Sequence, residues 1–206
     1  MAYSQFTLVT AKKAFNLVTV EEIELLTPTN KIQCSEYLTK TLQYNVPMAL
    51  ASNTEKARSE MIITPILIEV RKQLNSSFNL FSGVEFDVEP TKNLTGYCDF
   101  ILSYSSEKLF VAAPVIMLVE AKNENIKGGL GQCVAEMVAA QIFNEREDNE
   151  ISTIYGVVTT GTIWQFLKLT KTKVEIIVDN HFDKTKTYEQ KVNAYCRYGS
   201  CRMYKS

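Results

Sequence analysis

The stretch Pro114-Val-Ile-Met-Leu-Val-Glu-Ala-Lys122 carries the strongest structural signal in this chain. The five residues after the proline are all apolar, so an extended strand here would be apolar on both faces. Such a strand is normally central in a sheet that is covered on both sides. Because side chains two positions apart share a face, Glu120 and Lys122 continue the face of Ile116 and Leu118. The stretch therefore predicts a buried central strand from whose end a carboxylate and an ammonium emerge together.

The preceding strand-like run, residues 97–104, sets a single acidic residue, Asp99, in an apolar frame. Asp is unfavourable in strands and is rarely fully buried without a partner. If the two runs form an antiparallel hairpin, Asp99 lies across from Glu120, and two carboxylates there repel each other unless a divalent cation sits between them. Taken singly, Asp99 also fits a turn, and Glu120 with Lys122 also fits a strand end that reaches solvent. Together they predict a metal site.

Helical and strand-like patterns alternate along the rest of the chain. Helices are expected at 35–44, 54–74 and 130–147, and strands at 80–88, 97–104, 115–121, 153–159, 162–169 and 174–178. Residues 6–9 and 15–20 are compatible with short strands, whereas Thr19 resembles a helix cap. Pro65 is expected to kink its helix or divide it in two, because proline lacks the N–H and clashes with the preceding turn. The order of elements predicts an α/β (α+β) domain with one mixed sheet.

Gly128-Gly129 is expected to break the chain before the helix at 130–147. A glycine-rich segment in front of a helix has the geometry of an anion site, and it also fits a plain flexible connection.

The composition limits the class of protein. The chain has 206 residues, 46% of them hydrophobic and 22% charged, with a net charge of -1. These values are typical of one soluble globular domain and exclude a basic nucleic-acid coat. The longest apolar run, 111–119, is too short to span a membrane, and the N-terminus lacks a secretory pattern. Five cysteines without a C-x-x-C pair fit free thiols in a reducing compartment, so a cytoplasmic protein is expected.

An Asp on one strand followed by Glu-x-Lys on the next resembles the PD-(D/E)XK nuclease superfamily, which includes restriction endonucleases, λ exonuclease and archaeal Holliday junction resolvases. Glu120-Ala121-Lys122 matches the (D/E)-x-K element and Asp99 matches the motif Asp, while Cys98 stands where many members have Pro. The resemblance covers residues 54–160. It implies a restriction endonuclease-like core of helix, three strands, helix and strand, with extra strands at the C-terminus and a helical N-terminal extension.

Two helical positions extend the resemblance. Glu60 lies on the helix predicted at 54–74, the first helix of the core, where many members carry a Glu that completes the metal site and orients a water molecule. Gln132 opens the helix after Lys122, where several branches carry a Gln or Lys that faces the phosphate or the nucleophile. Each position also fits a solvated polar side chain. Glu136 lies one turn after Gln132 on the same face, and it also fits a surface residue or a partner of Lys127.

The resemblance implies a mechanism. Asp99 and Glu120 would bind Mg²⁺, with Mn²⁺ as a substitute, and the carbonyl of Ala121 and waters would complete the coordination. The cation would lower the pKa of a bound water, and Lys122 would hold that water and offset charge on the scissile phosphate. The implied activity is Mg²⁺-dependent hydrolysis of phosphodiester bonds in DNA, a deoxyribonuclease reaction.

The chain divides by this interpretation into an N-terminal extension packed on the core (1–50), a nuclease-like domain (51–180) and a basic tail (181–206). Residues 171–206 carry eight Lys and Arg against four Asp and Glu, which fits either phosphate contact or a solvated tail. The near-neutral net charge keeps a second hypothesis open, a non-cleaving nucleic-acid-binding or complex-forming module on the same fold. Endonuclease versus exonuclease action, a homodimer and a partner subunit that supplies specificity also stay open.

Overall fold

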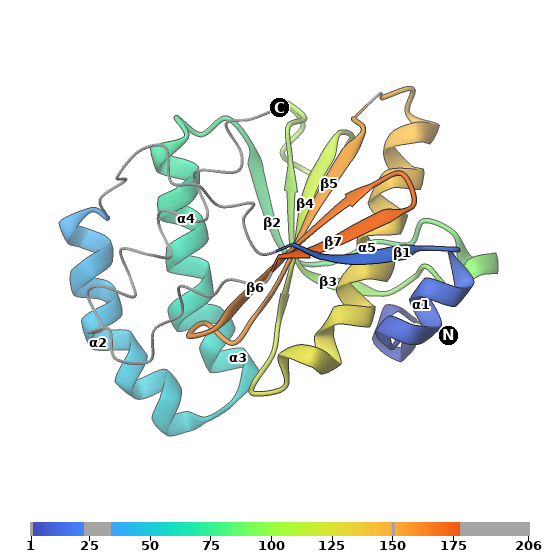
Figure 1. Ribbon diagram of the computed structural model, residues 1–206. Helices are drawn as coiled ribbons and strands as arrows, with labels where there is room; N and C mark the ends of the chain where they lie inside the picture. Colours follow the sequence, from blue (N-terminus) through green and yellow to red (C-terminus); the bar gives the residue numbers. More distant parts are fainter. Residues whose placement is uncertain (1, 23–33, 150, 178–206) are drawn as a thin grey trace.

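The computed structural model describes residues 2–22, 34–149 and 151–177, which form a mixed α/β structure around one seven-stranded sheet (Figure 1). The strands are β1 (Val18–Glu22), β2 (Asn79–Glu85), β3 (Tyr97–Ser103), β4 (Val115–Ala121), β5 (Thr153–Thr159), β6 (Trp164–Thr170) and β7 (Lys173–Ile177). Their order in the sheet is β1-β7-β6-β5-β4-β3-β2. β4 pairs with β5, and β1 with β7, in parallel, and the other neighbours are antiparallel. The mixed sheet agrees with the fold class predicted above.

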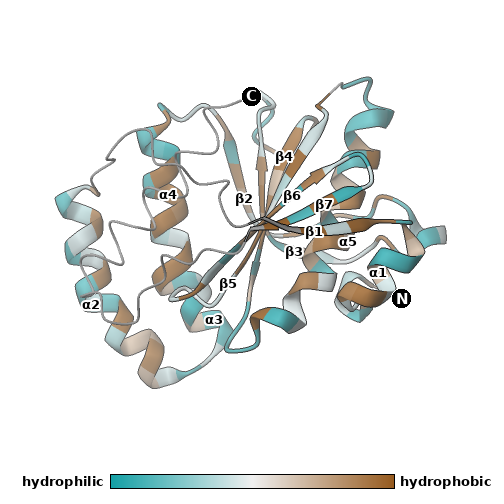
Figure 2. Ribbon diagram, in the orientation of Figure 1, coloured by the Kyte–Doolittle hydropathy of each residue, from teal (hydrophilic) through white to brown (hydrophobic). Residues whose placement is uncertain are grey.

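Helices cover both faces of the sheet. They are α1 (Leu8–Ala14), α2 (Glu36–Ser52), α3 (Glu55–Arg58), α4 (Thr64–Gln73) and α5 (Ile126–Arg146), with 3₁₀ turns at Tyr3–Gln5 and Pro90–Lys92 and a π-helical turn at Ser59–Ile63. Figure 1 places α2, α3 and α4 on one side of the sheet and α1 with α5 on the other. The central strands are largely hydrophobic, and apolar side chains of both helical layers pack against them (Figure 2).

β4 is the buried central strand that the sequence predicts. All seven of its residues are buried, and it lies between β3 and β5. Leu118 packs in the apolar cluster beneath α5, whereas Val119 and Ala121 pack in the cluster beneath α2 and α4. The prediction that Ile116 shares the face of Leu118 is wrong, because Ile116 packs in the cluster beneath α2 and α4. The pairing of β3 with β4 shifts register after Leu102, and a bulge of this kind reverses the alternation of side chains.

The helical segment around Pro65 is irregular but is not divided by a gap. α3, the π-helical turn and α4 follow one another without a gap, and Pro65 lies in the first turn of α4. Pro65 has no N–H to offer the carbonyl of Met61, and the side chain of Asn45 donates to that carbonyl instead, at 3.0 Å. The hydroxyl of Thr64 donates to the carbonyl of Ser59 at 2.9 Å. The carbonyl of Ser59 also accepts from the backbone N–H of Thr64, so a side chain replaces a backbone donor only at Met61 among these two carbonyls.

The break expected at Gly128-Gly129 is wrong, because α5 begins at Ile126 and these glycines lie inside it. The glycines serve close packing. A Cβ on Gly129 would lie 2.7 Å from Cγ1 of Val158, and one on Gly131 would lie 2.2 Å from the backbone carbonyl carbon of Thr7. Only glycine allows helix and neighbouring backbone to approach so closely. The segment is therefore a packed helix start and not a flexible connection.

The N-terminal residues belong to the sheet. The strand expected at 15–20 is present as β1, which pairs with β7, so Thr19 lies in a strand and does not begin a helix. The strand expected at 6–9 is wrong, because Thr7 caps α1 there and its hydroxyl accepts from the N–H of Thr10. The extension at 1–50 thus supplies an edge strand as well as helices. The predicted basic tail, 181–206, lies outside the described residues.

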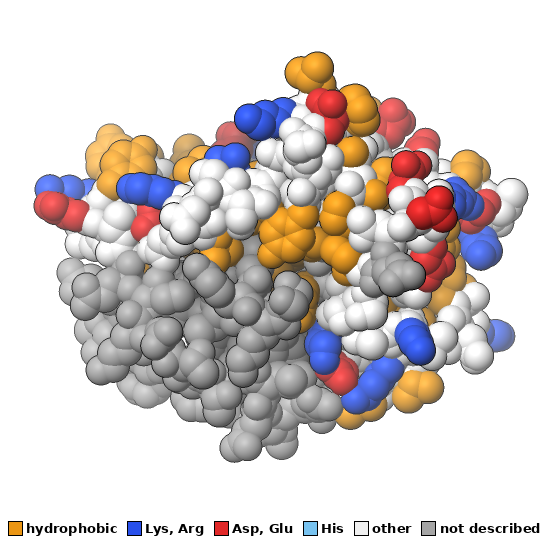
Figure 3. All heavy atoms as spheres, turned by 90° about the horizontal axis from the view of Figure 1, so that it is seen from above, with side chains coloured by type: hydrophobic (Ala, Val, Ile, Leu, Met, Phe, Trp, Pro, Cys, Tyr) orange, Lys and Arg blue, Asp and Glu red, His pale blue; other side chains and the backbone are white. Residues whose placement is uncertain are grey.

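Cys98 and Cys133 are buried free thiols, as their apolar neighbours predict. Cys34 departs from that expectation, because it is disulfide-bonded. Within the described ranges, none of the helices has the length and apolar character needed to cross a membrane. On the face of the molecule seen in Figure 3, acidic and basic side chains lie close to one another and not in separate areas. The surface there therefore reflects the near-neutral net charge.

Candidate active site

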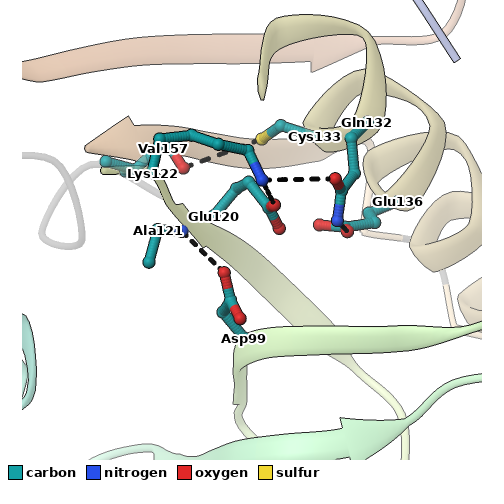
Figure 4. Close-up of polar contacts among 8 residues, drawn as sticks. All are labelled: Asp99, Glu120, Ala121, Lys122, Gln132, Cys133, Glu136 and Val157. Atoms are coloured by element: carbon teal, nitrogen blue, oxygen red, sulfur yellow. Dashed lines mark hydrogen bonds and ion pairs between the residues drawn. The ribbon is translucent and has the colours of Figure 1, made fainter. Parts of the chain in front are cut away.

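The carboxyl end of β4 meets β3 at the candidate site. The two strands are antiparallel, as the sequence argument requires, and their regular pairing ends at Phe100 opposite Val119. One step further along, the carboxylate of Asp99 accepts a hydrogen bond from the backbone N–H of Ala121 at 2.8 Å. Asp99 thus lies beside Glu120 at the point where the two strands diverge (Figure 4).

Glu120 and Lys122 point to the same side of β4, toward α5. The ammonium of Lys122 donates to Oε1 of Glu120, and it also donates to Oε1 of Gln132 at 3.4 Å. Glu120 is only 1% exposed, and its second oxygen, Oε2, has no hydrogen-bond partner. A buried carboxylate oxygen without a donor is costly, so this position has unused capacity to bind a cation or a proton.

α5 contributes the other two polar side chains. Because they are four residues apart in α5, Gln132 and Glu136 fall one turn apart, on the side that faces β4. The amide of Gln132 donates from Nε2 to Oε1 of Glu136 at 3.1 Å. Glu136 is 0% exposed, and its Oε2 likewise has no partner. Glu136 is therefore neither a surface residue nor a partner of Lys127, the two alternatives that the sequence left open for it.

The protonation of the cluster follows from burial and from crowding of like charges. Burial raises the pKa of Asp99 above its usual range, against the opposing effect of the Ala121 N–H. Burial, with the negative charge of Asp99, raises the pKa of Glu120 to about 8. Burial and the charge of Glu120 also raise the pKa of Glu136 well above its ordinary value. Burial alone would lower the pKa of Lys122, but the Glu120 carboxylate outweighs it and the net change is upward.

The residues present fit a divalent cation. Three carboxyl groups face one ammonium, so the fully ionised cluster carries a charge of -3 + 1 = -2. The described residues contain no preassembled group of three or more His, Cys, Asp or Glu ligands. Mg²⁺ requires less, because it keeps several waters and is commonly held by one or two carboxylates. The unpartnered oxygen of Glu120, beside the carboxylate of Asp99, offers such a position.

Glu60 is not brought into this cluster. It lies in the π-helical turn, its side chain is 59% exposed, and its ion-pair partner is Lys56 at 3.1 Å. Glu55, at the start of α3, is the carboxylate of this segment whose charge contributes to the raised pKa values of Glu120 and Lys122. A π-helical turn changes the angular position of its residues relative to a continuous α-helix. Sequence spacing could not predict that change.

Arg58 is a residue of this region that the sequence did not single out. Its guanidinium is mostly buried and donates to Oδ1 of Asn123 at 2.9 Å, to the carbonyl of Thr160 at 3.1 Å and to Oδ1 of Asn53 at 3.2 Å. It ties α3 to the segment that directly follows Lys122. A charged residue on a short helix looks like a surface residue in sequence, so no local signal marked it.

Comparison with known proteins adds no relative to this description. The chain matches no model of a known protein family, and no similar curated protein is found. Any function must therefore be argued from the side chains that meet at the end of β4.

Proposed function

We propose that this protein is a metal-dependent nuclease of the PD-(D/E)XK type that hydrolyses phosphodiester bonds of DNA with a Mg²⁺-activated water. The observation that carries the proposal is the buried, unpartnered oxygen of Glu120, placed next to Asp99 and on the same side of β4 as Lys122. The order of elements from α3 and α4 through β2, β3 and β4 to α5 and β5 also supports it. That order resembles the helix, three strands, helix and strand of restriction endonuclease-like cores.

Asp99 and Glu120 would hold the cation, with the backbone carbonyl of Ala121 as a further ligand. When bound, Mg²⁺ supplies stabilisation of negative charge and a water of lowered pKa. Lys122 would place its ammonium against the scissile phosphate and offset the charge that develops there. Gln132, which already bonds to Lys122, would orient the ammonium or a phosphate oxygen. The contacts of Glu60 do not support a role for it in this scheme.

A second candidate is a module that binds nucleic acid or another protein without cleavage. The observation that favours it is electrostatic, because the net charge is -1 and the face in Figure 3 intermingles acidic and basic side chains. Proteins that hold a nucleic acid usually present clustered Lys and Arg to its phosphates. A nuclease that met DNA through that face would bind it weakly or with the help of a partner subunit.

The test is cleavage of linear, nicked and circular DNA, single- and double-stranded, in Mg²⁺, Mn²⁺ or EDTA. Asp99→Ala and Lys122→Ala are expected to lower the metal-dependent rate by roughly 100-fold or more, the scale for losing a group that stabilises transition-state charge. Lys127→Ala is the matched control, because Lys127 is an exposed lysine near the start of α5. It is expected to leave the rate unchanged.

Each outcome decides between the candidates. Cleavage by the parent and the control alone supports a nuclease centred on these residues, and preference for circular or linear DNA then separates endonuclease from exonuclease action. Cleavage that survives both substitutions rules this site out. Binding of DNA without cleavage of any substrate in either metal favours the second candidate.

A further inference from the structure

Gln132 lies between the ammonium of Lys122 and the carboxyl group of Glu136. An ammonium can only donate and a carboxyl group keeps an acceptor oxygen whether or not it is protonated, whereas an amide has one end of each kind. Oε1 of Gln132 faces Nζ of Lys122 at 3.4 Å, and Nε2 faces Oε1 of Glu136 at 3.1 Å (Figure 4). The reversed amide would set an NH₂ group against the ammonium. The ammonium of Lys122 therefore decides the orientation of the amide, which leaves Nε2 to donate to Glu136.

Glu136 carries a cost to stability. It is 0% exposed, its second oxygen has no partner, and its neighbours Ala135, Met137 and Ala139 on α5 belong to the apolar cluster between α5 and the sheet. Replacing a buried ionisable group with an apolar one of similar size is often neutral or stabilising. Packing therefore does not account for a carboxyl group at this position, whose polar neighbours are Gln132 and Glu120.

We propose that Glu136 is a positioning residue for Lys122 that acts through Gln132. By accepting from Nε2, Glu136 holds Oε1 of Gln132 toward Lys122 as a second acceptor from a second element of the fold. The ammonium is then fixed by α5 as well as by its bond to Glu120. Glu120 can turn toward a cation while Lys122 keeps its place. The proposal rests on the proposed function, in which Lys122 acts on the phosphate.

The kinetic test is a double-mutant cycle. Glu136→Met removes the acceptor and is expected to lower kcat about 10-fold with little change in KM, the lower end of what orienting partners contribute. Glu136→Gln keeps an acceptor oxygen and is expected to stay within about 3-fold of the parent. In a Gln132→Ala background, Glu136→Met is expected to cost nothing further, because residues that act through one another are not additive.

A second readout does not depend on cleavage. The side-chain amide signals of Gln132 in heteronuclear NMR spectra are identified by their loss in Gln132→Ala. Glu136→Met is expected to shift them and to speed their exchange with water, and Glu136→Gln is expected to leave the exchange slow. If the parent cleaves no DNA, the proposed function fails and this measurement alone decides the positioning role.

Three results would overturn the proposal. One is an equal loss of kcat from Glu136→Met with and without Gln132. Another is Glu136→Gln as damaging as Glu136→Met, which would make the negative charge and not the acceptor important. The last is an unchanged Gln132 amide signal in Glu136→Met.

Discussion

The two ends of β4 treat buried polar groups in opposite ways. At the amino end, the side chain of Asn144 accepts from the N–H of Val115 at 2.8 Å and donates to its carbonyl at 2.7 Å. At the carboxyl end, Glu120 and Glu136 each keep a buried oxygen without a partner. Both ends are covered by α5, so the difference lies in the side chains and not in the architecture.

The contrast separates stability from function. A satisfied buried hydrogen bond contributes about 1 kcal/mol, whereas an unsatisfied buried group costs about 1–3 kcal/mol and more if it is charged. The amino end thus holds the sheet to the helix, and the carboxyl end weakens the fold where Asp99, Glu120 and Lys122 meet. Strained or unsatisfied polar groups of this kind are typical of functional sites.

The largest expected effect is a loss of stability when the hydrogen bonds at the amino end of β4 are removed. Asn144→Ala leaves both backbone groups of Val115 without their partner and is expected to lower the free energy of unfolding by about 2–4 kcal/mol. Urea denaturation measures the change. Gln141→Ala is the control, because Gln141 lies one turn earlier on α5 and bonds only to the nearby Glu145 at 3.1 Å. Its expected cost is below about 0.5 kcal/mol, and similar costs for both variants would contradict the role given to Asn144.

At the carboxyl end of β4, a substitution is expected to raise the free energy of unfolding and not to lower it. Because the pKa of Glu120 in the folded protein, about 8, lies above its unfolded value, the folded state binds the extra proton. The stabilising effect is complete below the unfolded pKa and is lost as the pH rises toward about 8. Glu120→Gln is expected to remove this loss and to raise stability at pH 8 relative to the parent, by about 1 kcal/mol or more. Urea denaturation at a series of pH values measures it.

Glu69 is the control for that pH series. Burial would raise its pKa, but hydrogen bonds from the side chain of Gln73 and from Ser35 outweigh burial, so its pKa is lowered. Its contribution to stability is therefore present above its unfolded pKa and is lost on acidification. Glu69→Gln should flatten the acidic limb of the curve and Glu120→Gln the alkaline limb. Identical pH profiles for the two variants would contradict the contrast between the two carboxylates.

The smallest expected effect is a shift in the pH dependence of stability when Glu55 loses its charge. Its charge contributes to the raised pKa of Glu120, so Glu55→Gln is expected to shift the alkaline loss of stability to lower pH by less than about one unit. The shift should shrink in high salt, because the residue is exposed and its charge is screened. Glu60→Gln, which removes only a surface ion pair with Lys56, should leave the midpoint in place. A larger shift from Glu60 would restore it to the cluster.

Local pattern accounts for the parts that were predicted correctly. The apolar run before Glu120 predicted β4 at 115–121, and the apolar residues around Asp99 predicted the neighbouring strand β3. Pro65 marked the irregular helix because a missing N–H acts wherever it lies. Gln132 lies near Lys122, as the resemblance implied, although it stands in the second turn of α5 and does not open the helix.

The features that the sequence did not predict depend on contacts between distant residues or on irregular helix geometry. The glycines of α5 were wrongly predicted to break the chain, because the close contacts that require them are with Thr7 and Val158, which are far away in the sequence. Glu60 does not contact the cluster, and the π-helical turn that contains it alters helical phase without a sequence signal. The burial of Arg58 likewise depends on Asn123 and Thr160, which only folding brings to it.

The sequence by itself determined the central strand, its partner and the acidic and basic residues at their ends, because alternation and apolar runs are properties of neighbouring residues. Only the tertiary structure decided that Glu136 is buried against Gln132, that α1 packs on Gly131 and that Glu120 lacks a second partner. Burial and unsatisfied hydrogen bonds are set by every element that packs around a side chain, and those elements come from distant parts of the chain.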